Sequence, residues 1–310
     1  CFFMLTEHFH NTQKDTGHYS NDLRYVLSLQ NTIAAFEEIK TWEGYAKTPL
    51  HSLDSLASDI GVKNIYYKDE SSRFGLGSFK ALGGTYGVLK FIHHALKKEI
   101  GDEVSMKDIH AGKYSEQISK YTVTTATDGN HGRSVAFGAK LFGCKCQIYI
   151  HSEVSSGRQK AMEDLEATVN RISGNYDASL QICIEDAGKN NWHVISDTSY
   201  EGYTKYPRYI MAGYNVMAEE IIDQIKDRPL PTHVFLQGGV GSFPGAICGY
   251  FWEKFPGNNI KFVVVESEHA PCLIRSAQNN QMTSVSIKQE TMMAGLSCGE
   301  PSLLGWEILK

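Results

Sequence analysis

The sequence predicts an α/β protein made of two three-layer domains with mostly parallel sheets. From about residue 60 onward, short runs of β-branched and aromatic residues alternate with helical segments of about 10 to 20 residues, as in βαβ units. Two of the runs, Val234–Leu236 and Phe262–Val265, are apolar throughout, which is typical of strands buried on both faces of a parallel sheet. The length of 310 residues corresponds to about two domains.

Each element is predicted from its local composition. Gly143 is expected to end the helix before it, because glycine readily adopts the left-handed conformation found at helix C-termini. Residues 1 to about 30 show no clear period and are expected to form an irregular arm. We predict strands at residues 64–68, 121–125, 146–150, 169–172, 194–195, 233–237 and 261–265, and helices at residues 80–98, 134–142, 156–166, 178–189, 206–225 and 244–255.

Composition excludes several classes of function. The net charge of −5 gives no basic footprint for nucleic acid and no basic patch for an anionic membrane. No stretch approaches the roughly 18 apolar residues of a membrane span. We therefore expect a chain that binds neither nucleic acid nor membrane and takes a small-molecule substrate.

Cysteines and histidines indicate neither a disulfide framework nor a metal site. There are seven cysteines, an odd number, and we interpret them as reduced thiols of a cytoplasmic protein, leaving open whether Cys272 and Cys298 pair. The C-x-C of Cys144 and Cys146 has neither zinc-pair nor redox spacing. No cysteine or carboxylate at ligand spacing accompanies the histidine pairs, so we predict no metal; these pairs are His8 with His10 and His93 with His94.

A glycine-rich loop follows the predicted strand at residues 233–237 and opens a helix. Glycines let the backbone approach an anion closely, and the amides of the helix N-terminus then point at it. The loop is therefore a candidate phosphate site, although a plain strand–helix turn has the same residue types. The residues concerned are Gly238, Gly239, Val240, Gly241 and Ser242.

Two ligands are compatible with this loop. A dinucleotide would use the glycines up to Gly245, with Glu266 at the end of the next strand near the ribose. Pro244 occupies the third glycine position of that fingerprint, which weakens this interpretation. The alternative is the phosphate of a small cofactor such as pyridoxal phosphate.

Lys80 is the second candidate. It lies at the predicted start of a helix, where the positive end of the helix dipole disfavours an ammonium and so favours the neutral amine needed for a Schiff base. Gly83 and Gly84 follow inside the helix at a cost of about 1 kcal/mol each, which suggests close approach by a ligand or another element. The alternative is that Lys80 is an ordinary surface lysine.

A polar turn after the strand at residues 121–125 is the third candidate. Thr127 or Asp128 could cap the following helix and leave its amides for a carboxylate, and Asp128 is also a candidate base. Asn130 offers a donor and an acceptor for a phenolic oxygen. The alternative is that Asp128 is only a cap and His131 only a half-buried core histidine.

Together the three segments resemble pyridoxal-phosphate enzymes of the tryptophan-synthase β family (fold type II), which includes threonine dehydratases and cysteine synthases. Within it the chain is most similar to ammonia-lyases that act on 2,3-diaminopropionate, because Asp128 stands where threonine dehydratases typically carry serine. The matching stretches are residues 68–75, 127–133, 197–205, 237–241, 293–301 and 304–309.

The resemblance implies an α,β-elimination of D- or L-2,3-diaminopropionate to pyruvate and ammonia. Lys80 would form the Schiff base and remove the α-proton of one enantiomer, and Asp128 would remove that of the other. Asp197 would hold the second amino group; the alternative is that Asp197 is only a cap or a loop-tightening aspartate. The remaining implied roles are phosphate binding by Gly238, Gly239, Val240, Gly241 and Ser242, contact with the pyridine 3′-oxygen by Asn130, and substrate carboxylate binding by Thr127, Asp128, Gly129, Asn130 and His131.

The resemblance also implies a domain organisation and a homodimer. A larger cofactor-phosphate domain would comprise residues 1–82 and 191–310, and a smaller inserted domain residues 83–190. The family pattern continues beyond residue 310 with a strand end that contacts the pyridine nitrogen, so the larger domain is expected to be incomplete here. Three alternatives stay open: a threonine/serine dehydratase or cysteine synthase, an NAD(P)-dependent oxidoreductase, and an inactive fragment.

Overall fold

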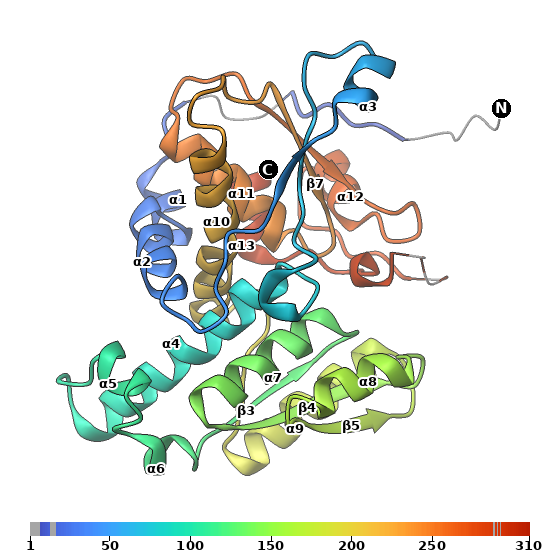
Figure 1. Cartoon of the computed structure of the whole chain (residues 1–310). Helices are drawn as coiled ribbons and strands as arrows, with labels where there is room; N and C mark the ends of the chain where they lie inside the picture. Colours follow the sequence, from blue (N-terminus) through green and yellow to red (C-terminus); the bar gives the residue numbers. More distant parts are fainter. Residues whose placement is uncertain (1–6, 13–16, 288, 290, 292) are drawn as a thin grey trace. The chain divides into compact units, whose positions relative to one another are not determined.

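The computed structural model describes residues 7–12, 17–287, 289, 291 and 293–310 (Figure 1). Two compact units are present. We call the first the lysine unit; it comprises Leu29–Asp197 and Tyr203–Leu230. The second, the glycine-loop unit, comprises the described residues up to Ser28 together with Thr198–Gly202 and Pro231–Lys310. The predicted domain boundaries at residues 83 and 190 group the chain differently and stay a prediction.

The lysine unit is built on a four-stranded parallel sheet, which confirms the α/β class with parallel strands. The strand order is β5-β4-β3-β6, and all three neighbouring pairs are parallel. Every residue of β3 is buried, as expected for a strand covered on both faces. The strands are β3 (Thr122–Ala126), β4 (Lys145–His151), β5 (Thr168–Ile172) and β6 (His193–Val194).

Helices cover both faces of this sheet. Successive side chains of a strand point to opposite faces, and Thr124 of β3 contacts Cys183 of α9 at 3.3 Å between Oγ1 and Sγ. Helix α7 packs on β3 and β4 as well, and Figure 1 shows α7 and α9 with the strands between them. Helix α8 packs against β5. The helices are α7 (Asn130–Phe142), α8 (Ser156–Glu163) and α9 (Tyr176–Asn190).

Two long helices pack in succession beside α7. Helix α4 (Lys80–Ile100) packs against α7, and α10 (Lys205–Gln224) packs against α4. The predicted helix ends are confirmed to within a few residues, and Gly143 ends α7 in the left-handed conformation with φ +84°. Helix α7 begins at Asn130, directly after the polar turn that was expected to open it.

The glycine pair of α4 is what allows these helices to touch. A Cβ on Gly83 would collide with the Tyr214 ring and lie 2.7 Å from the Ile210 carbonyl oxygen, both on α10. A Cβ on Gly84 would collide with the Ser134 hydroxyl of α7. The close approach predicted from the glycine pair is therefore made by two other helices of the same unit.

The rest of the lysine unit includes an antiparallel strand pair that the sequence did not predict as a pair. Leu50–Ser52 (β1) pairs with Tyr66–Lys68 (β2), and β2 is the shortened form of the strand predicted at residues 64–68. The remaining helices of this unit are α2 (Leu29–Ile39), α3 (Asp54–Asp59), η1 (Arg73–Gly75), α5 (Met106–His110) and α6 (Ser115–Ile118).

The glycine-loop unit contains one parallel strand pair. β7 (His233–Gln237) pairs in register with β8 (Lys261–Val265). The expectation that these strands are buried on both faces is wrong for this pair, since Phe235 is 69% exposed and Val265 47% exposed. Among the described residues neither strand has a further neighbour in this sheet. So small a sheet leaves some of its apolar side chains uncovered. The helices are α1 (Asn21–Val26), α11 (Ser242–Lys254), α12 (Cys272–Asn279), η2 (Ala294–Leu296) and α13 (Leu303–Leu309).

The predicted irregular arm is partly corrected. Residues 1–6 and 13–16 of this arm lie outside the described residues. Helix α1 forms within it, because the Ser20 hydroxyl accepts a hydrogen bond from the Leu23 amide and so caps the helix. A six-residue helix of this kind is too short to show a hydrophobic period in the sequence.

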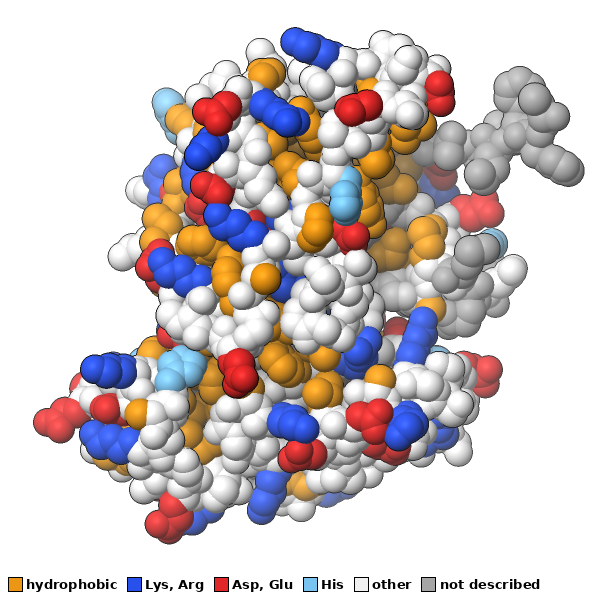
Figure 2. All heavy atoms as spheres, viewed as in Figure 1, with side chains coloured by type: hydrophobic (Ala, Val, Ile, Leu, Met, Phe, Trp, Pro, Cys, Tyr) orange, Lys and Arg blue, Asp and Glu red, His pale blue; other side chains and the backbone are white. Residues whose placement is uncertain are grey.

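Side chains of both charge signs are interspersed on the face shown in Figure 2. Neither Lys and Arg nor Asp and Glu gather into a large patch on that face. Among the described residues no helix combines the length and the apolar character needed to cross a membrane.

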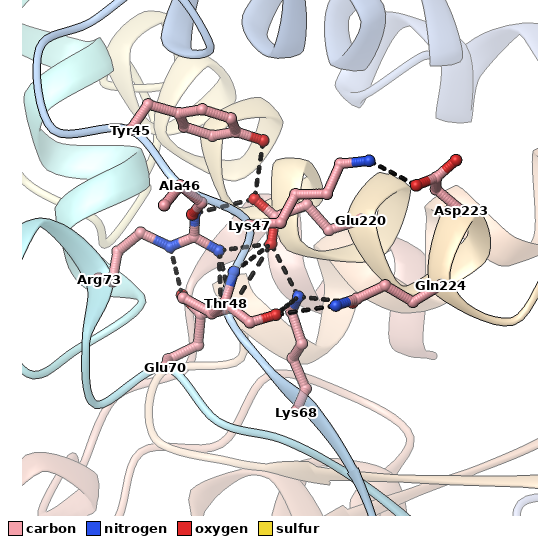
Figure 3. A network of polar contacts seen from close by, with 10 residues as sticks. All are labelled: Tyr45, Ala46, Lys47, Thr48, Lys68, Glu70, Arg73, Glu220, Asp223 and Gln224. Atoms are coloured by element: carbon pink, nitrogen blue, oxygen red, sulfur yellow. Dashed lines mark hydrogen bonds and ion pairs between the residues drawn. The ribbon is translucent and has the colours of Figure 1, made fainter.

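A buried ionic network holds the segment that leads to Lys80 (Figure 3). At its centre is Glu220 of α10, whose two carboxylate oxygens accept hydrogen bonds from Arg73 at 2.8 and 2.7 Å. Lys68 donates to the same carboxylate at 2.7 Å, and the Tyr45 hydroxyl donates at 2.9 Å. Glu70 pairs with Arg73 from the other side. Each buried charge therefore has a partner, which is the condition for such a network to be tolerated.

The network controls the protonation of Glu220. Burial alone would raise the pKa of the Glu220 carboxyl, but the hydrogen bonds and charges of Arg73 and Lys68 outweigh burial and hold this pKa below its ordinary value of 4.5. Glu220 is therefore ionised at neutral pH and ties β2 and the residues after it to α10.

We expect Gly83→Ala to lower the free energy of unfolding by about 1–3 kcal/mol, because the added methyl group overpacks the contact between α4 and α10. Urea unfolding followed by circular dichroism measures this change. Gly188→Ala is the matched control, since Gly188 lies in α9 with nothing within 4 Å of an added Cβ. The control is expected to be neutral or stabilising by up to ~1 kcal/mol. Equal effects of the two substitutions would contradict the packing account.

We expect Glu220→Gln to destabilise the protein by about 3–5 kcal/mol at neutral pH, because it leaves buried Arg73 and Lys68 charges without their shared partner. Asp223→Asn is the control on the same helix; its pair with Lys47 is exposed and is worth about 0–1 kcal/mol.

The stabilisation from Glu220 should also depend on pH. A carboxyl whose pKa is lowered by folding stabilises the fold above its ordinary pKa, and this contribution is lost as the pH falls through the lower pKa of the folded state. The difference in unfolding free energy between wild type and Glu220→Gln should therefore shrink below about pH 4.5. A difference that stays constant or grows on acidification would contradict the assignment.

Candidate active site

Lys80 is the first residue of α4. The Ser134 hydroxyl of α7 donates to the Lys80 carbonyl oxygen at 2.6 Å, and Ser78 accepts from the Lys80 amide at 3.2 Å. These two bonds fix the backbone from which the Lys80 side chain extends. Its Nζ forms an ion pair with Asp197, and only 22% of the side chain is exposed. The alternative that Lys80 is an ordinary surface lysine is therefore not what the structure shows.

Asp197 lies shortly after the end of β6. Besides pairing with Lys80, its Oδ2 lies 3.4 Å from the Tyr214 hydroxyl and 3.8 Å from Nδ1 of His131. Burial would raise the pKa of Asp197, but the charge and the hydrogen bond of Lys80 oppose burial, and this pKa is held far below its usual range. Asp197 is therefore ionised, and its carboxylate stabilises the Lys80 ammonium that the helix dipole alone would disfavour.

His131 presents an acceptor toward Asp197. Its Nε2 lies 2.8 Å from the Ile195 carbonyl oxygen, which can only accept, so Nε2 carries the proton. Burial lowers the pKa of His131, so the ring is neutral and Nδ1 carries a lone pair. Nδ1 is buried with no hydrogen-bond partner within the described parts of the chain. Two acceptors, His131 Nδ1 and Asp197 Oδ2, thus lie 3.8 Å apart and suit a cationic donor.

The turn at residues 127–131 is capped by Thr127 rather than Asp128. The Thr127 Oγ1 accepts from the amides of Gly129 and Gly132, each at 3.0 Å. This early cap explains why α7 starts at Asn130, which is exposed. The alternative that Asp128 is only a cap is not observed. Assignment of this turn to the substrate carboxylate, and of Asn130 to the cofactor ring, stays a prediction.

Asp128 is held from the neighbouring strand. Its Oδ1 lies 2.9 Å from Nε2 of His151, the last residue of β4. The guanidinium of Arg158 donates to the Asp128 backbone carbonyl at 3.3 Å. The Asp128 side chain is 23% exposed, so it is partly accessible to a ligand.

Strand order brings these groups to one edge of the sheet. Asp128 follows β3, Asp197 follows β6 and His151 ends β4, and β3 is the parallel neighbour of both other strands. The carboxyl ends of parallel strands are where α/β proteins bind ligands. His151 and Tyr214 were not predicted. His151 could have been found from its position directly after the predicted strand at residues 146–150. Nothing in the sequence pointed to Tyr214.

The glycine-rich loop lies in the glycine-loop unit, between β7 and α11. Gly239 and Gly241 have positive φ values of 79° and 95°, and a Cβ on Gly241 would lie 2.9 Å from Leu273. Ser242 is the first residue of the 13-residue helix α11 and is buried. The loop thus has the conformation and the following helix that a phosphate site requires. Lys80 belongs to the other unit.

Glu266 has a structural partner that the dinucleotide interpretation did not consider. Its two carboxylate oxygens accept from the amides of Leu273 and Ile274 at 2.9 and 2.8 Å, at the start of α12. Burial raises the pKa of Glu266. A carboxylate that caps a helix in this way is engaged and does not suit recognition of a ribose hydroxyl. Cys272 and Cys298, whose pairing was left open, do not form a disulfide with each other.

These observations fit pyridoxal phosphate. The lysine unit has a lysine amine beside an ionised carboxylate and an unbonded buried His131 nitrogen, and the glycine-loop unit has two glycines with positive φ values directly before a helix. Within the described ranges no group of three or more His, Cys, Asp or Glu residues is arranged to hold a metal ion.

Comparisons with known proteins indicate the same cofactor. The family described as "Pyridoxal-phosphate dependent enzyme" matches residues 41–310. Diaminopropionate ammonia-lyase of Escherichia coli K12 is 39% identical over 268 residues, which cover 86% of this chain and 66% of that relative. The chain therefore spans about two thirds of the length of this relative.

Solved structures of the Escherichia coli enzyme have the same fold. Its complex with an aminoacrylate–PLP azomethine reaction intermediate superposes with a TM-score of 0.84 at 36% identity, covering 96% of this chain and 72% of that one. Its complex with D-serine gives a TM-score of 0.82 at 35% identity, covering 96% and 73%. The chain therefore belongs to the family of pyridoxal-phosphate-dependent enzymes and has their fold type II architecture.

Proposed function

We propose that the protein catalyses the α,β-elimination of 2,3-diaminopropionate to pyruvate and ammonia. The observation that carries this proposal is the pair of acceptors beside Lys80. Asp197 Oδ2 and His131 Nδ1 lie 3.8 Å apart and suit a second ammonium group, which serine and threonine lack. Similarity to diaminopropionate ammonia-lyases supports the same substrate.

The reaction needs a base at the substrate α-carbon and a departing β-amino group. Bound pyridoxal phosphate supplies the electron sink that accepts the electron pair of the broken Cα–H bond. Lys80 takes the α-proton of one enantiomer and Asp128 that of the other. Both side chains are partly exposed and anchored at helix starts or strand ends, which suits a base that must meet a ligand.

Asp197 orients the β-ammonium group. When the Cβ–N bond breaks, its electron pair stays on nitrogen, so a β-amino group that is still an ammonium leaves directly as neutral ammonia. The ionised Asp197 carboxylate stabilises that ammonium form until the bond breaks. The released 2-aminoacrylate then hydrolyses to pyruvate and a second ammonia.

The remaining assignments belong to the same proposal. The glycine-rich loop, Gly238 to Ser242, holds the cofactor phosphate, Asn130 contacts its ring oxygen, and Thr127 to His131 bind the substrate carboxylate. The enzyme acts in the cytoplasm as a homodimer. The left-handed conformation of Gly239 and Gly241 is what supports the phosphate assignment.

The direct test is pyruvate release from D- and L-2,3-diaminopropionate, with pyridoxal phosphate supplied and D- and L-serine and threonine as comparisons. We expect faster release from diaminopropionate. Faster turnover of serine or threonine would instead assign a dehydratase. No turnover of any substrate would contradict the proposal for this chain and favour the inactive-fragment alternative.

We expect Asp197→Asn to lower kcat/KM for diaminopropionate about ten- to a hundredfold more than kcat/KM for serine. The reason is that a hydrogen bond to a charged group contributes about 1.5–3 kcal/mol, and only diaminopropionate carries the second ammonium. Because both reactions use Lys80, the ratio of the two kcat/KM values cancels any effect of the substitution on Lys80. Asp164→Asn, at an exposed carboxylate paired with Lys160, is the control. An equal loss for both substrates would contradict this role of Asp197.

A further inference from the structure

We infer that His151 is a positioning residue for Asp128. In this arrangement a neutral His151 ring donates a hydrogen bond from Nε2 to the Asp128 carboxylate and fixes its rotation. The inference rests on the proposed function, in which Asp128 removes the α-proton of one enantiomer.

The tautomer of His151 follows from its two contacts. The backbone amide of Glu153 donates to Nδ1 of His151 at 3.3 Å, so Nδ1 must carry a lone pair. In a neutral imidazole the proton is then on Nε2, which lies 2.9 Å from Oδ1 of Asp128. The ring therefore acts as a donor toward the carboxylate without carrying a charge.

The backbone that carries His151 is itself anchored. His151 pairs with Ile172 in the β4–β5 register. Arg171 of β5 donates to the carbonyl oxygens of Ser152 and Val154 at 2.7 and 2.8 Å, which fixes the turn after β4. The His151 side chain is only 10% exposed. A ring held in this way has few alternative orientations, so its hydrogen bond restrains Asp128 rather than following it.

The restraint matters because Asp128 does not cap α7. Thr127 takes the amides that an aspartate in this turn would otherwise bind. The Asp128 carboxylate is directed to His151 of β4. Placement of a base to within a fraction of an ångström strongly affects the rate of proton transfer, and the route through Lys80 does not use this contact.

The test compares two substitutions of His151 on the two enantiomers of diaminopropionate. Asp128→Asn first identifies the enantiomer that depends on Asp128. His151→Phe, which keeps a ring but removes the donor, should lower kcat for that enantiomer about ten- to a hundredfold, with KM and the other enantiomer changed less than about threefold. His151→Gln, whose amide can donate from nearly the same place as Nε2, should restore most of the lost rate.

His110→Phe is the matched control. His110 forms a second histidine–carboxylate pair, with its Nε2 2.5 Å from Glu38, and lies outside the candidate site. The His110→Phe substitution should leave the ratio of the kcat values for the two enantiomers unchanged. Equal losses on both enantiomers for His151→Phe would indicate a merely structural role and overturn the inference, as would wild-type rates.

A second measurement does not require turnover. Nitrogen-15 NMR of histidine-labelled protein without added cofactor, assigned by the signal lost in His151→Gln, should show a protonated Nε2 and an unprotonated Nδ1 that shift in Asp128→Asn. A protonated Nδ1, or no response to Asp128→Asn, would overturn the inference. If wild-type protein turns over neither enantiomer, the proposed function fails, and this NMR result alone decides whether His151 donates to Asp128.

Discussion

Contact between three helices at two glycines is the constraint on which the lysine unit depends. Because Gly83 and Gly84 lack side chains, α4 touches α10 on one side and α7 on the other. The same contact places Lys80 one turn earlier on α4, where Ser134 of α7 binds its carbonyl oxygen. Helix α7 in turn begins at the polar turn, and α10 carries Glu220. Local packing thus fixes the origins of the lysine, the turn and the ionic network together.

Three carboxylates of the lysine unit have different surroundings. The surroundings indicate which carboxylate stabilises the fold and which ones suit a part in the reaction. Glu220 is fully buried, and its hydrogen bonds come from several fixed donors, so it has nothing to offer a ligand. Asp197 is also ionised, but it pairs with a lysine amine that is partly exposed, and the histidine nitrogen 3.8 Å away is an acceptor without a hydrogen bond. Asp128 is partly exposed and lies 2.9 Å from Nε2 of His151. The last two suit proton and ammonium handling, whereas Glu220 suits only the fold.

Much of the fold follows from the sequence, because strand composition, helix length and residues such as Gly143 act locally. The glycine pair also predicted a close approach correctly. Contacts between distant residues could not be predicted in the same way. That His151 faces Asp128 depends on β3 and β4 being neighbours, which no local pattern specifies. Exposure of Phe235 likewise depends on how many strands the sheet has. The cap of α7 itself is a local contact, and the sequence left it open between Thr127 and Asp128. The glycine-rich loop, Lys80 and the polar turn were predicted as candidates from local motifs, and Asp197 and the individual roles from the family resemblance. The mutual geometry of the residues came from the structure.

The central claim is that this packing makes Lys80 the lysine that holds the cofactor. The most direct measurement is to load the chain with pyridoxal phosphate, reduce it with borohydride so that a lysine-bound cofactor becomes permanent, and locate the modified residue by peptide mass spectrometry. We predict modification at Lys80 and its loss in Lys80→Ala. Modification centred on another lysine, or unchanged labelling of Lys80→Ala, would contradict the account.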